Sequence, residues 1–217
     1  MYERTVLVVE DEPFIRGLIC DKLESDGFKV LAASSAAEAR KISEDADIDI
    51  SVLDIELGNG PTGFDLGIAL HKTYPGMALV FLTHIPEPRI IGLDSKSIPK
   101  NAAYLLKERL VDPEVLNQAI EAALRDRVGK EYRDDLKPAH PLVHMSRTQL
   151  EVLRMLAEGK SNQQIAAARG TTLRAVENLV TRAITAAGID AESKTSARVI
   201  AVREFIRVAG LPSTQQK

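Results

Sequence analysis

The stretch Ile48-Asp-Ile-Ser-Val-Leu-Asp54 decides how this sequence of 217 residues folds, because it is an apolar run that ends in a carboxylate. A short run of this kind, bounded by polar residues, predicts a buried strand. The run Thr5-Val-Leu-Val-Val9 is similar, and the acidic residues Glu10-Asp-Glu12 follow it directly. Carboxylates at the ends of two strands suit a divalent metal ion. The pattern therefore points to phosphate chemistry.

Working outward, the first half of the chain alternates short apolar runs with amphipathic segments. Strands are predicted at residues 5–9, 29–32, 48–53, 78–82 and 103–106, and helices at residues 14–26, 36–45, 64–74 and 112–127. This alternation predicts a parallel sheet with helices on both faces. In such a sheet the ligand crevice lies at the carboxyl ends of the strands, where the strand order reverses. Asp11, Asp54, Thr83 and Lys107 all fall at predicted strand ends.

The last third of the chain has helical periodicity only. Its four predicted helices begin near polar capping residues, namely Ser146, Ser161 or Asn162, Thr172 and Ser193. Between the two halves lies a stretch of mixed charges with two prolines and little apolar periodicity, which is typical of a linker. We therefore expect a domain at residues 1–126, a linker at residues 127–144 and a second domain at residues 145–210.

Charge distinguishes the two predicted domains. Residues 1–124 contain 12 Lys and Arg against 21 Asp and Glu, whereas residues 139–217 contain 11 against 6. An acidic first domain suits a metal pocket, and a basic second domain suits a polyanion. The single cysteine, Cys20, excludes an intrachain disulfide. No apolar run approaches the roughly 18 residues of a membrane span and no signal peptide is evident, so a cytoplasmic protein without a membrane partner is expected.

The residues at the predicted strand ends have complementary tasks in phosphoryl transfer. Asp11 and Asp54 offer oxygen ligands to Mg²⁺, and Glu10 is suited to orient a water on that ion. Asp54 is then a carboxylate nucleophile that can form an acyl phosphate, whose oxygens Lys107 and the Thr83 hydroxyl can bind. Singly, each residue has a plain structural alternative, such as a helix cap or a turn. The prediction depends on their occurring together.

Residues 4 to about 125 resemble the receiver domain of two-component response regulators. The matching stretches are Val6-Leu-Val-Val-Glu-Asp-Glu-Pro13, Val52-Leu-Asp-Ile-Glu-Leu57, Gly63-Phe-Asp-Leu66, Phe81-Leu-Thr83 and Ala103-Tyr-Leu-Leu-Lys107. The resemblance implies an α/β domain with a five-stranded, parallel, doubly wound sheet of the flavodoxin-like type. It also implies a sensor histidine kinase as the partner that phosphorylates the chain.

The resemblance assigns a role to each matching position. Asp54 would accept the phosphoryl group, and Thr83 and Tyr104 would change rotamer once it arrives. Four groups would hold the magnesium ion, namely the side chains of Glu10, Asp11 and Asp54 and the carbonyl of Glu56.

Three features depart from the receiver pattern. Glu108 follows Lys107 where the family usually has a proline, so the turn that aims the lysine is expected to be looser. His84 follows Thr83 where a small residue is usual, and it either crowds the phosphate or is a partly exposed loop residue. The prolines within residues 85–102 leave room for only a short fourth helix. The route of the signal out of the domain is therefore left open.

The last third of the chain contains four motif stretches, namely Ser146-Arg-Thr-Gln-Leu-Glu-Val-Leu153, Gly159-Lys-Ser-Asn-Gln-Gln-Ile-Ala166, Thr172-Leu-Arg-Ala-Val-Glu-Asn-Leu-Val180 and Ala187-Gly-Ile189. Through these stretches, residues 146–208 resemble the small all-α, LuxR-type helix-turn-helix domain of regulators of the NarL/FixJ class. The helix that begins at Thr172 would enter the major groove of double-stranded DNA, with its N-terminal end suited to a phosphate. The alternative is a solvated helix face without base contacts.

The resemblance divides the outward residues of that helix into two groups. Glu177, Asn178 and Thr181 lie where base edges are read, and Lys160, Arg174 and Arg182 lie where they can meet phosphates. Glutamate can accept from cytosine N4, and asparagine can pair with adenine. The last helix either pairs two copies of the chain or completes the core of its own domain.

The sequence thus predicts a response regulator whose Mg²⁺-dependent phosphorylation at Asp54 promotes dimerisation and DNA binding, with no enzymatic activity beyond its own phosphorylation. Three alternatives remain open. The receiver is never phosphorylated and DNA binding is constitutive, or the chain is an aspartyl-phosphate hydrolase of the haloacid dehalogenase type. The third alternative is a LuxR-type sensor of a small ligand, which would need an aromatic-lined pocket; the acidic residues at the strand ends and the absence of tryptophan speak against it.

Overall fold

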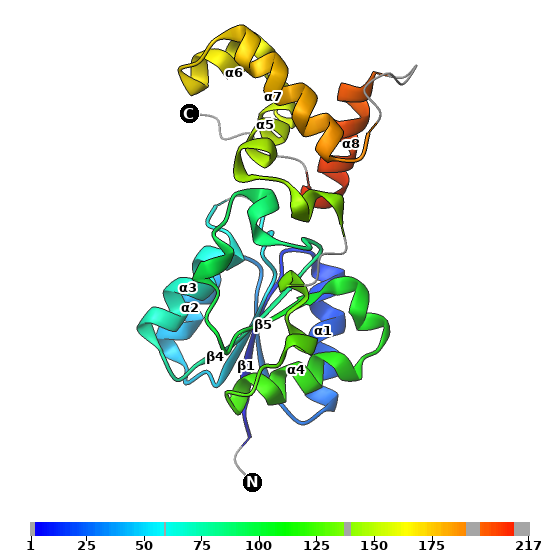
Figure 1. The fold of residues 1–217 in the computed structure, drawn as a ribbon. Helices are drawn as coiled ribbons and strands as arrows, with labels where there is room; N and C mark the ends of the chain where they lie inside the picture. The colour runs from blue at the N-terminus through cyan, green and yellow to red at the C-terminus, as the bar shows by residue number, and fades with distance from the viewer. Residues whose placement is uncertain (1–2, 59, 137–139, 190–195, 211–217) are drawn as a thin grey trace. The chain divides into compact units, whose positions relative to one another are not determined.

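The structure is a computed structural model that describes residues 3–58, 60–136, 140–189 and 196–210 (Figure 1). It divides into two units. The first contains Met1–His84 and Lys96–Leu136, and the second contains Ile85–Ser95 and Lys137–Lys217. None of the helices within the described ranges is both long and apolar enough to cross a membrane. The predicted boundaries of the domains and of the linker stay predictions.

The first unit is built on a five-stranded parallel sheet. Its strands are β1 (Thr5–Val9), β2 (Lys29–Ala33), β3 (Ile50–Leu53), β4 (Ala78–Thr83) and β5 (Ala103–Leu106). They pair in the order β2-β1-β3-β4-β5. The direction of winding reverses between β1 and β3, which places a crevice at the carboxyl ends of these two strands. The predicted flavodoxin-like fold is confirmed.

Four helices cover the two faces of this sheet (Figure 1). They are α1 (Pro13–Ser25), α2 (Ala36–Asp45), α3 (Gly63–Thr73) and α4 (Glu114–Leu124). Ser35 caps α2, and Thr62 with Asp65 forms a capping box at the start of α3. One core cluster joins α1 and α4 to the sheet through residues such as Leu23 and Ile120, which are fully buried.

The connection between β4 and β5 differs from the expectation of a short fourth helix. Residues 84–102 are all described and contain two 3₁₀ turns, η1 (Pro88–Ile91) and η2 (Ser95–Ser97), but no α-helix. Pro86, Pro88 and Pro99 disfavour α-helix here, because proline removes an amide donor and its ring clashes with the preceding turn. Instead, residues 85–95 belong to the helical second unit.

The second unit is helical in all its described parts. Its elements after η1 are η6 (Pro141–His144), α5 (Arg147–Ala157), α6 (Asn162–Arg169), α7 (Leu173–Ala186) and α8 (Ala197–Ala209). Ser146, Ser161 and Thr172 cap α5, α6 and α7 as predicted. Ser193, the predicted start of the last helix, lies outside the described residues.

Residues 85–95 are an integral part of this helical unit. Ile90 is 0 % exposed and belongs to the same core cluster as Leu150 and Phe205. The Arg154 guanidinium donates to the Ile90 carbonyl at 3.1 Å, and the Arg89 guanidinium donates to the Val143 carbonyl at 2.8 Å. The segment therefore supplies both apolar burial and hydrogen bonds to the helices.

Candidate functional site

Three carboxylates meet at the carboxyl ends of β1 and β3. Glu10 and Asp11 follow β1, Asp54 follows β3, and one oxygen from each lies within 4.8 Å of the others. Backbone pairing fixes their positions, because the Asp54 amide donates to the Val9 carbonyl at 2.8 Å and the Glu10 amide to the Ala33 carbonyl at 3.1 Å. The crevice expected from the sheet topology is thus lined with acidic side chains.

Lys107, directly after β5, joins this cluster. Its Nζ lies 2.9 Å from Asp54 Oδ2 and 2.7 Å from Glu10 Oε2, and all three side chains are buried. A cation between two buried carboxylates compensates charges that would otherwise be costly to bury. The other oxygen of Glu10, Oε1, is buried and has no hydrogen-bond partner among the described residues. An orphaned carboxylate oxygen beside two further carboxylates fits a hard divalent cation.

Burial shifts the acid strength of these groups. It raises the pKa of Glu10 to about 7, against the hydrogen bond from Lys107. It also raises the pKa of Glu56 to about 7, with the charge of Asp54 adding to the effect. The pKa of Asp54 is raised by burial as well, although Lys107 opposes the shift. Without a cation, the site therefore disfavours full ionisation at neutral pH.

The other predicted residues of the first unit are distributed around the same edge. The Glu56 amide donates to Asp54 Oδ1 at 3.2 Å, so the backbone of Glu56 adjoins the carboxylate cluster. Thr83 is the last residue of β4 and is 0 % exposed. Tyr104 is also 0 % exposed, and its ring lies 6.3 Å from that of Phe81. Tyr104 is thus buried within the sheet rather than placed at its end.

The two atypical residues beside Thr83 and Lys107 contact each other. His84 Nδ1 lies 3.7 Å from Glu108 Oε1, and the two side chains are 53 % and 66 % exposed. His84 therefore points outward as a loop residue, which was one of its two expected placements. Sequence reasoning missed this pair, because its members are far apart along the chain and each departs from the family pattern separately.

Two further residues shape the site without having been predicted to do so. A Cβ atom at Gly63 would overlap the Asp54 carbonyl, so only glycine allows α3 to begin against this strand end. Arg16 Nη1 donates to the Glu10 carbonyl at 2.6 Å and to the Asp11 carbonyl at 3.3 Å. Gly63 stands in a stretch matched to the receiver pattern, whereas no local signal identifies Arg16.

In the second unit, α7 presents a polar face and buries the opposite one. The buried side is formed by Val176, Val180, Ala183 and Ile184. The exposed residues include all those predicted for DNA contact on this helix, namely Arg174, Glu177, Asn178, Thr181 and Arg182. The arrangement leaves a continuous polar helix face, which is suited to a major groove.

Some of these residues already have local partners. The Thr172 hydroxyl accepts from the Ala175 amide at 3.2 Å and thereby caps α7. The Thr181 hydroxyl donates to the Glu177 carbonyl at 3.0 Å, within its own helix. Lys160 forms an ion pair with Glu158 before α6. The side chains of Thr181 and Lys160 would have to exchange these contacts to reach a nucleic acid.

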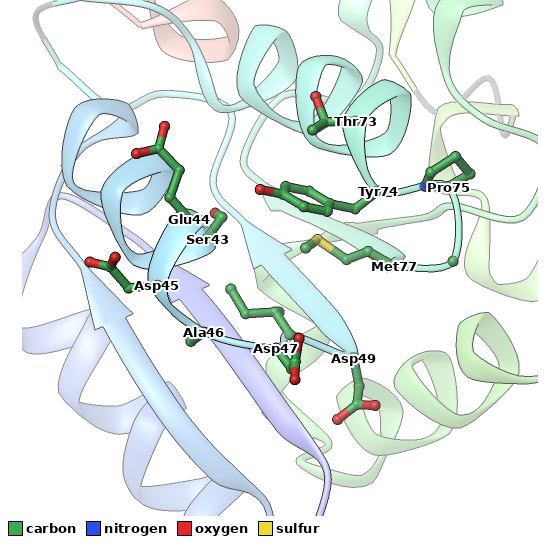
Figure 2. A pocket seen from close by; sticks show the side chains of 12 residues that line it. Ser43, Glu44, Asp45, Ala46, Asp47, Asp49, Thr73, Tyr74, Pro75 and Met77 are labelled. Atoms are coloured by element: carbon green, nitrogen blue, oxygen red, sulfur yellow. The ribbon is translucent and has the colours of Figure 1, made fainter.

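A pocket of about 600 Å³ lies near the starts of β3 and β4, at the opposite edge of the sheet (Figure 2). Its lining includes the acidic residues Asp45, Asp47 and Asp49, with Tyr74 and Met77 beside them. Asp49 accepts from the Thr5 amide at 2.7 Å, so it has a structural task. None of the residues predicted for phosphate chemistry lines this pocket.

Two known families match this chain, one in its first half and one in its last third. Residues 6–92 match the response regulator receiver domain, and residues 143–185 match the luxR family of bacterial regulatory proteins. The nitrate/nitrite response regulator protein NarP of Escherichia coli is 32 % identical over 173 residues, which cover 74 % of this chain and 78 % of NarP. Nodulation protein W of Bradyrhizobium diazoefficiens is 26 % identical, with 76 % and 71 % covered.

Solved structures agree in fold. The structure of two RcsB dimers bound to two parallel DNAs has a TM-score of 0.61 and 17 % identity, and covers 95 % of this chain and 99 % of that one. RcsB of Salmonella enterica serovar Typhimurium, bound to a promoter in the presence of phosphomimetic BeF₃⁻, has a TM-score of 0.54, 17 % identity and coverage of 94 % and 98 %. At such identities the similarity extends to the fold alone.

Proposed function

This chain belongs to the response regulators of the NarL/FixJ class, which carry a receiver domain and a LuxR-type DNA-binding domain, and from that premise we propose that phosphorylation of Asp54 controls its binding to DNA. The observation that carries the proposal is the contact of the buried Asp54 carboxylate with Lys107, at 2.9 Å, inside the acidic crevice. Membership of a family of transcription regulators leaves the hydrolase alternative without support.

The chemistry would be an in-line transfer from a phosphohistidine of a sensor kinase to Asp54. An Asp54 oxygen forms the new P–O bond while the P–N bond breaks, and the imidazole, protonated on its other ring nitrogen, leaves as a neutral group. Lys107 binds Asp54 Oδ2 and would bind a phosphoryl oxygen after transfer. The Thr83 hydroxyl would bind a second such oxygen. The reaction serves as a switch, so no turnover of a further substrate is involved.

Mg²⁺ would be held by Glu10, Asp11, Asp54 and the Glu56 carbonyl. When bound, it would neutralise negative charge on the transferred phosphoryl oxygens. Two observations support this assignment: the unpartnered Glu10 oxygen and the raised pKa values of Glu10 and Glu56. A divalent cation would bind that oxygen and would stabilise the ionised form of both carboxylates.

The raised pKa values predict how stability depends on pH. Between the ordinary glutamate pKa of 4.5 and about 7, the folded protein retains protons on Glu10 and Glu56 that the unfolded chain has lost. The contribution of these groups to the free energy of unfolding is therefore largest below pH 4.5 and is lost as the pH rises through 7. Mg²⁺ requires the ionised carboxylates, so it should raise the melting temperature more at pH 8 than at pH 6.

Differential scanning calorimetry of wild-type protein and Glu10→Gln, with and without Mg²⁺ at both pH values, checks this expectation. The glutamine variant should lose most of the difference between pH 6 and pH 8. An equal Mg²⁺ effect at the two pH values would show that the Glu10 carboxylate does not contribute to the cation site.

For the output, we propose that α7 binds the major groove of double-stranded DNA and that two copies of the chain bind together. The exposed face of α7 and the excess of Lys and Arg over Asp and Glu in residues 139–217, 11 against 6, support DNA contact. Val199 on α8 is 60 % exposed, which supports the use of α8 as a pairing surface. Two recognition helices would then meet half-sites about one helical turn apart.

Substitutions on α7 should separate base contacts from phosphate contacts. Asn178→Ala is expected to cost about 1–3 kcal/mol on a selected duplex and much less on random DNA, because a base contact is lost. Arg174→Gln should weaken binding to both DNAs and should reduce the slope of log affinity against log salt concentration by about one. Thr185→Ala is the control, since Thr185 is exposed on the same helix but is assigned no contact with a base or a phosphate. Fluorescence anisotropy over a salt series measures all three, and equal losses for Asn178→Ala on both DNAs would contradict its assignment.

Selection of duplexes from a random pool by the full chain tests the proposed output directly. With Mg²⁺ and beryllofluoride, the selected sequences should contain two half-sites spaced about one turn apart, with weaker enrichment when beryllofluoride is omitted. Enrichment of a single motif to the same degree in both conditions would favour the constitutive alternative.

A further inference from the structure

The segment after α4 returns to the edge of the sheet and reaches the turn that carries Lys107. Arg133 forms a parallel bridge with Tyr104 of β5, and Asp134 follows it at 4 % exposure. The Leu106 amide donates to Asp134 Oδ2 at 3.1 Å. The carboxylate of Asp134 thus lies against the residue that immediately precedes Lys107.

Asp134 also binds the far side of the same turn. Arg109 Nη1 lies 3.1 Å from Asp134 Oδ1 and 3.2 Å from Oδ2, and it donates to the Glu131 carbonyl at 2.7 Å. One buried carboxylate therefore holds the residue before Lys107 and the second residue after it. Hydrogen bonds with a charged partner are roughly twice as strong as those between neutral groups, so this clamp restrains the turn strongly.

The clamp acts on a turn that begins without a side-chain cap of its own. Lys107 begins the 3₁₀ helix η3 (Lys107–Val111), and no side chain within the turn caps it at Leu106. The next residue, Glu108, is an exposed glutamate. Lys107 Nζ nevertheless lies 2.9 Å from Asp54 Oδ2 and 2.7 Å from Glu10 Oε2.

We propose that Asp134 is a positioning residue for phosphoryl transfer: it fixes the turn from Leu106 to Arg109 so that Lys107 is aimed at Asp54. The inference rests on the proposed phosphorylation of Asp54 and deepens it. Through Asp134, the segment that leads out of the first unit contacts the turn that carries Lys107. Because binding linkage is reciprocal, a change at Lys107 must alter how firmly this segment is held.

The neighbouring Asp135 provides a matched control. It is 7 % exposed, and it forms an equally close ion pair, with Arg133 Nε and Nη2 at 2.7 and 2.8 Å. That pair lies within the segment itself, whereas Asp134 reaches β5 and η3. Asp135→Asn therefore removes a comparable buried charge from the same segment and leaves the hydrogen bonds of Asp134 to Leu106 and Arg109 in place.

The test measures the rate of phosphorylation of the full chain by acetyl phosphate with Mg²⁺, followed by intact-protein mass spectrometry. Asp134→Asn is expected to lower the maximal rate about tenfold or more, because small misplacements of a reacting group are costly, with little change in the acetyl phosphate concentration at half-maximal rate. Asp134→Glu should recover part of the loss, and Asp135→Asn should stay within about twofold of wild type. In a Lys107→Ala background, Asp134→Asn should cause no further loss.

Each other outcome has a distinct meaning. Equal losses in Asp134→Asn and Asp135→Asn, or a loss that persists in the Lys107→Ala background, would overturn the positioning role while leaving Asp54 phosphorylation intact. Absence of any adduct on the wild-type chain would overturn the proposed function and this inference with it. If Asp134→Asn does not fold, Arg109→Gln, which keeps the Leu106 bond, should still lower the rate about threefold, and a wild-type rate in that variant would overturn the inference.

Discussion

Replacing Asp54 with asparagine is expected to abolish uptake of a phosphoryl group from acetyl phosphate. The substitution removes the carboxylate oxygen that would attack phosphorus, and an amide does not substitute for it as a nucleophile. The fold should survive, because the side chains are nearly isosteric and Lys107 keeps its 2.7 Å contact with Glu10. Intact-protein mass spectrometry in the presence of Mg²⁺ reports the adduct directly.

Asp47→Asn is the matched control for this experiment. Asp47 is exposed and lines the pocket shown in Figure 2, and the same change of charge is therefore made at the opposite edge of the sheet from the crevice. This variant should be phosphorylated as wild type. An adduct of undiminished yield on Asp54→Asn would contradict the assignment and would point to another acceptor in the chain.

Replacing Ile90 with alanine is expected to destabilise the helical second unit by about 2–5 kcal/mol. Ile90 is 0 % exposed and packs in the core cluster formed with α5 and α8, so truncation leaves a cavity among these helices. Since domains are stable by only about 5–15 kcal/mol, a loss of this size is a large share of the total. Urea unfolding followed by circular dichroism measures the change.

Hydrogen exchange shows where the Ile90→Ala effect falls. Amides of α5 and α8 should exchange faster, whereas those of α4 in the first unit should change little. Ile91→Ala is the control, because Ile91 is only partly buried against the same cluster and its truncation should cost less. If Ile90→Ala accelerated exchange in the sheet of the first unit instead, residues 85–95 would not belong to the helical unit.

Local patterns were sufficient to predict most of the fold. The apolar runs that became β1 and β5 are strands with the predicted ends, and Ser146, Ser161 and Thr172 cap their helices. Such features depend on residues close together in the chain. The meeting of Glu10, Asp11, Asp54 and Lys107 was also predictable, because parallel strands place their carboxyl ends at one edge.

The features that were missed depend on contacts between distant parts of the chain. The prolines of residues 85–102 indicate that a long helix is disfavoured, but not that Ile90 is buried among the helices of the second unit. The same holds for Asp134, which reads as one charge in a polar linker until it meets Leu106 and Arg109. No periodicity or motif marks contacts of this kind.

Two connections of the chain lead from the proposed phosphate site to the helical unit. Thr83 ends β4, and the chain that follows it enters the helical unit at Ile85. Lys107 ends β5, and its turn is held by Asp134 in the segment that also leads to that unit. A phosphate that draws Thr83 and Lys107 toward Asp54 would therefore act on both connections, without the usual fourth helix.

The most direct test of the account is the affinity of the full chain for a selected duplex, measured by fluorescence anisotropy with Mg²⁺ and with or without beryllofluoride. We predict that beryllofluoride tightens binding by wild-type protein about 5- to 150-fold, the range typical of coupled sites, and leaves Asp54→Asn unchanged. Equal affinities of wild-type protein in the two conditions, despite a phosphoryl adduct on Asp54, would contradict the claim that this residue controls DNA binding.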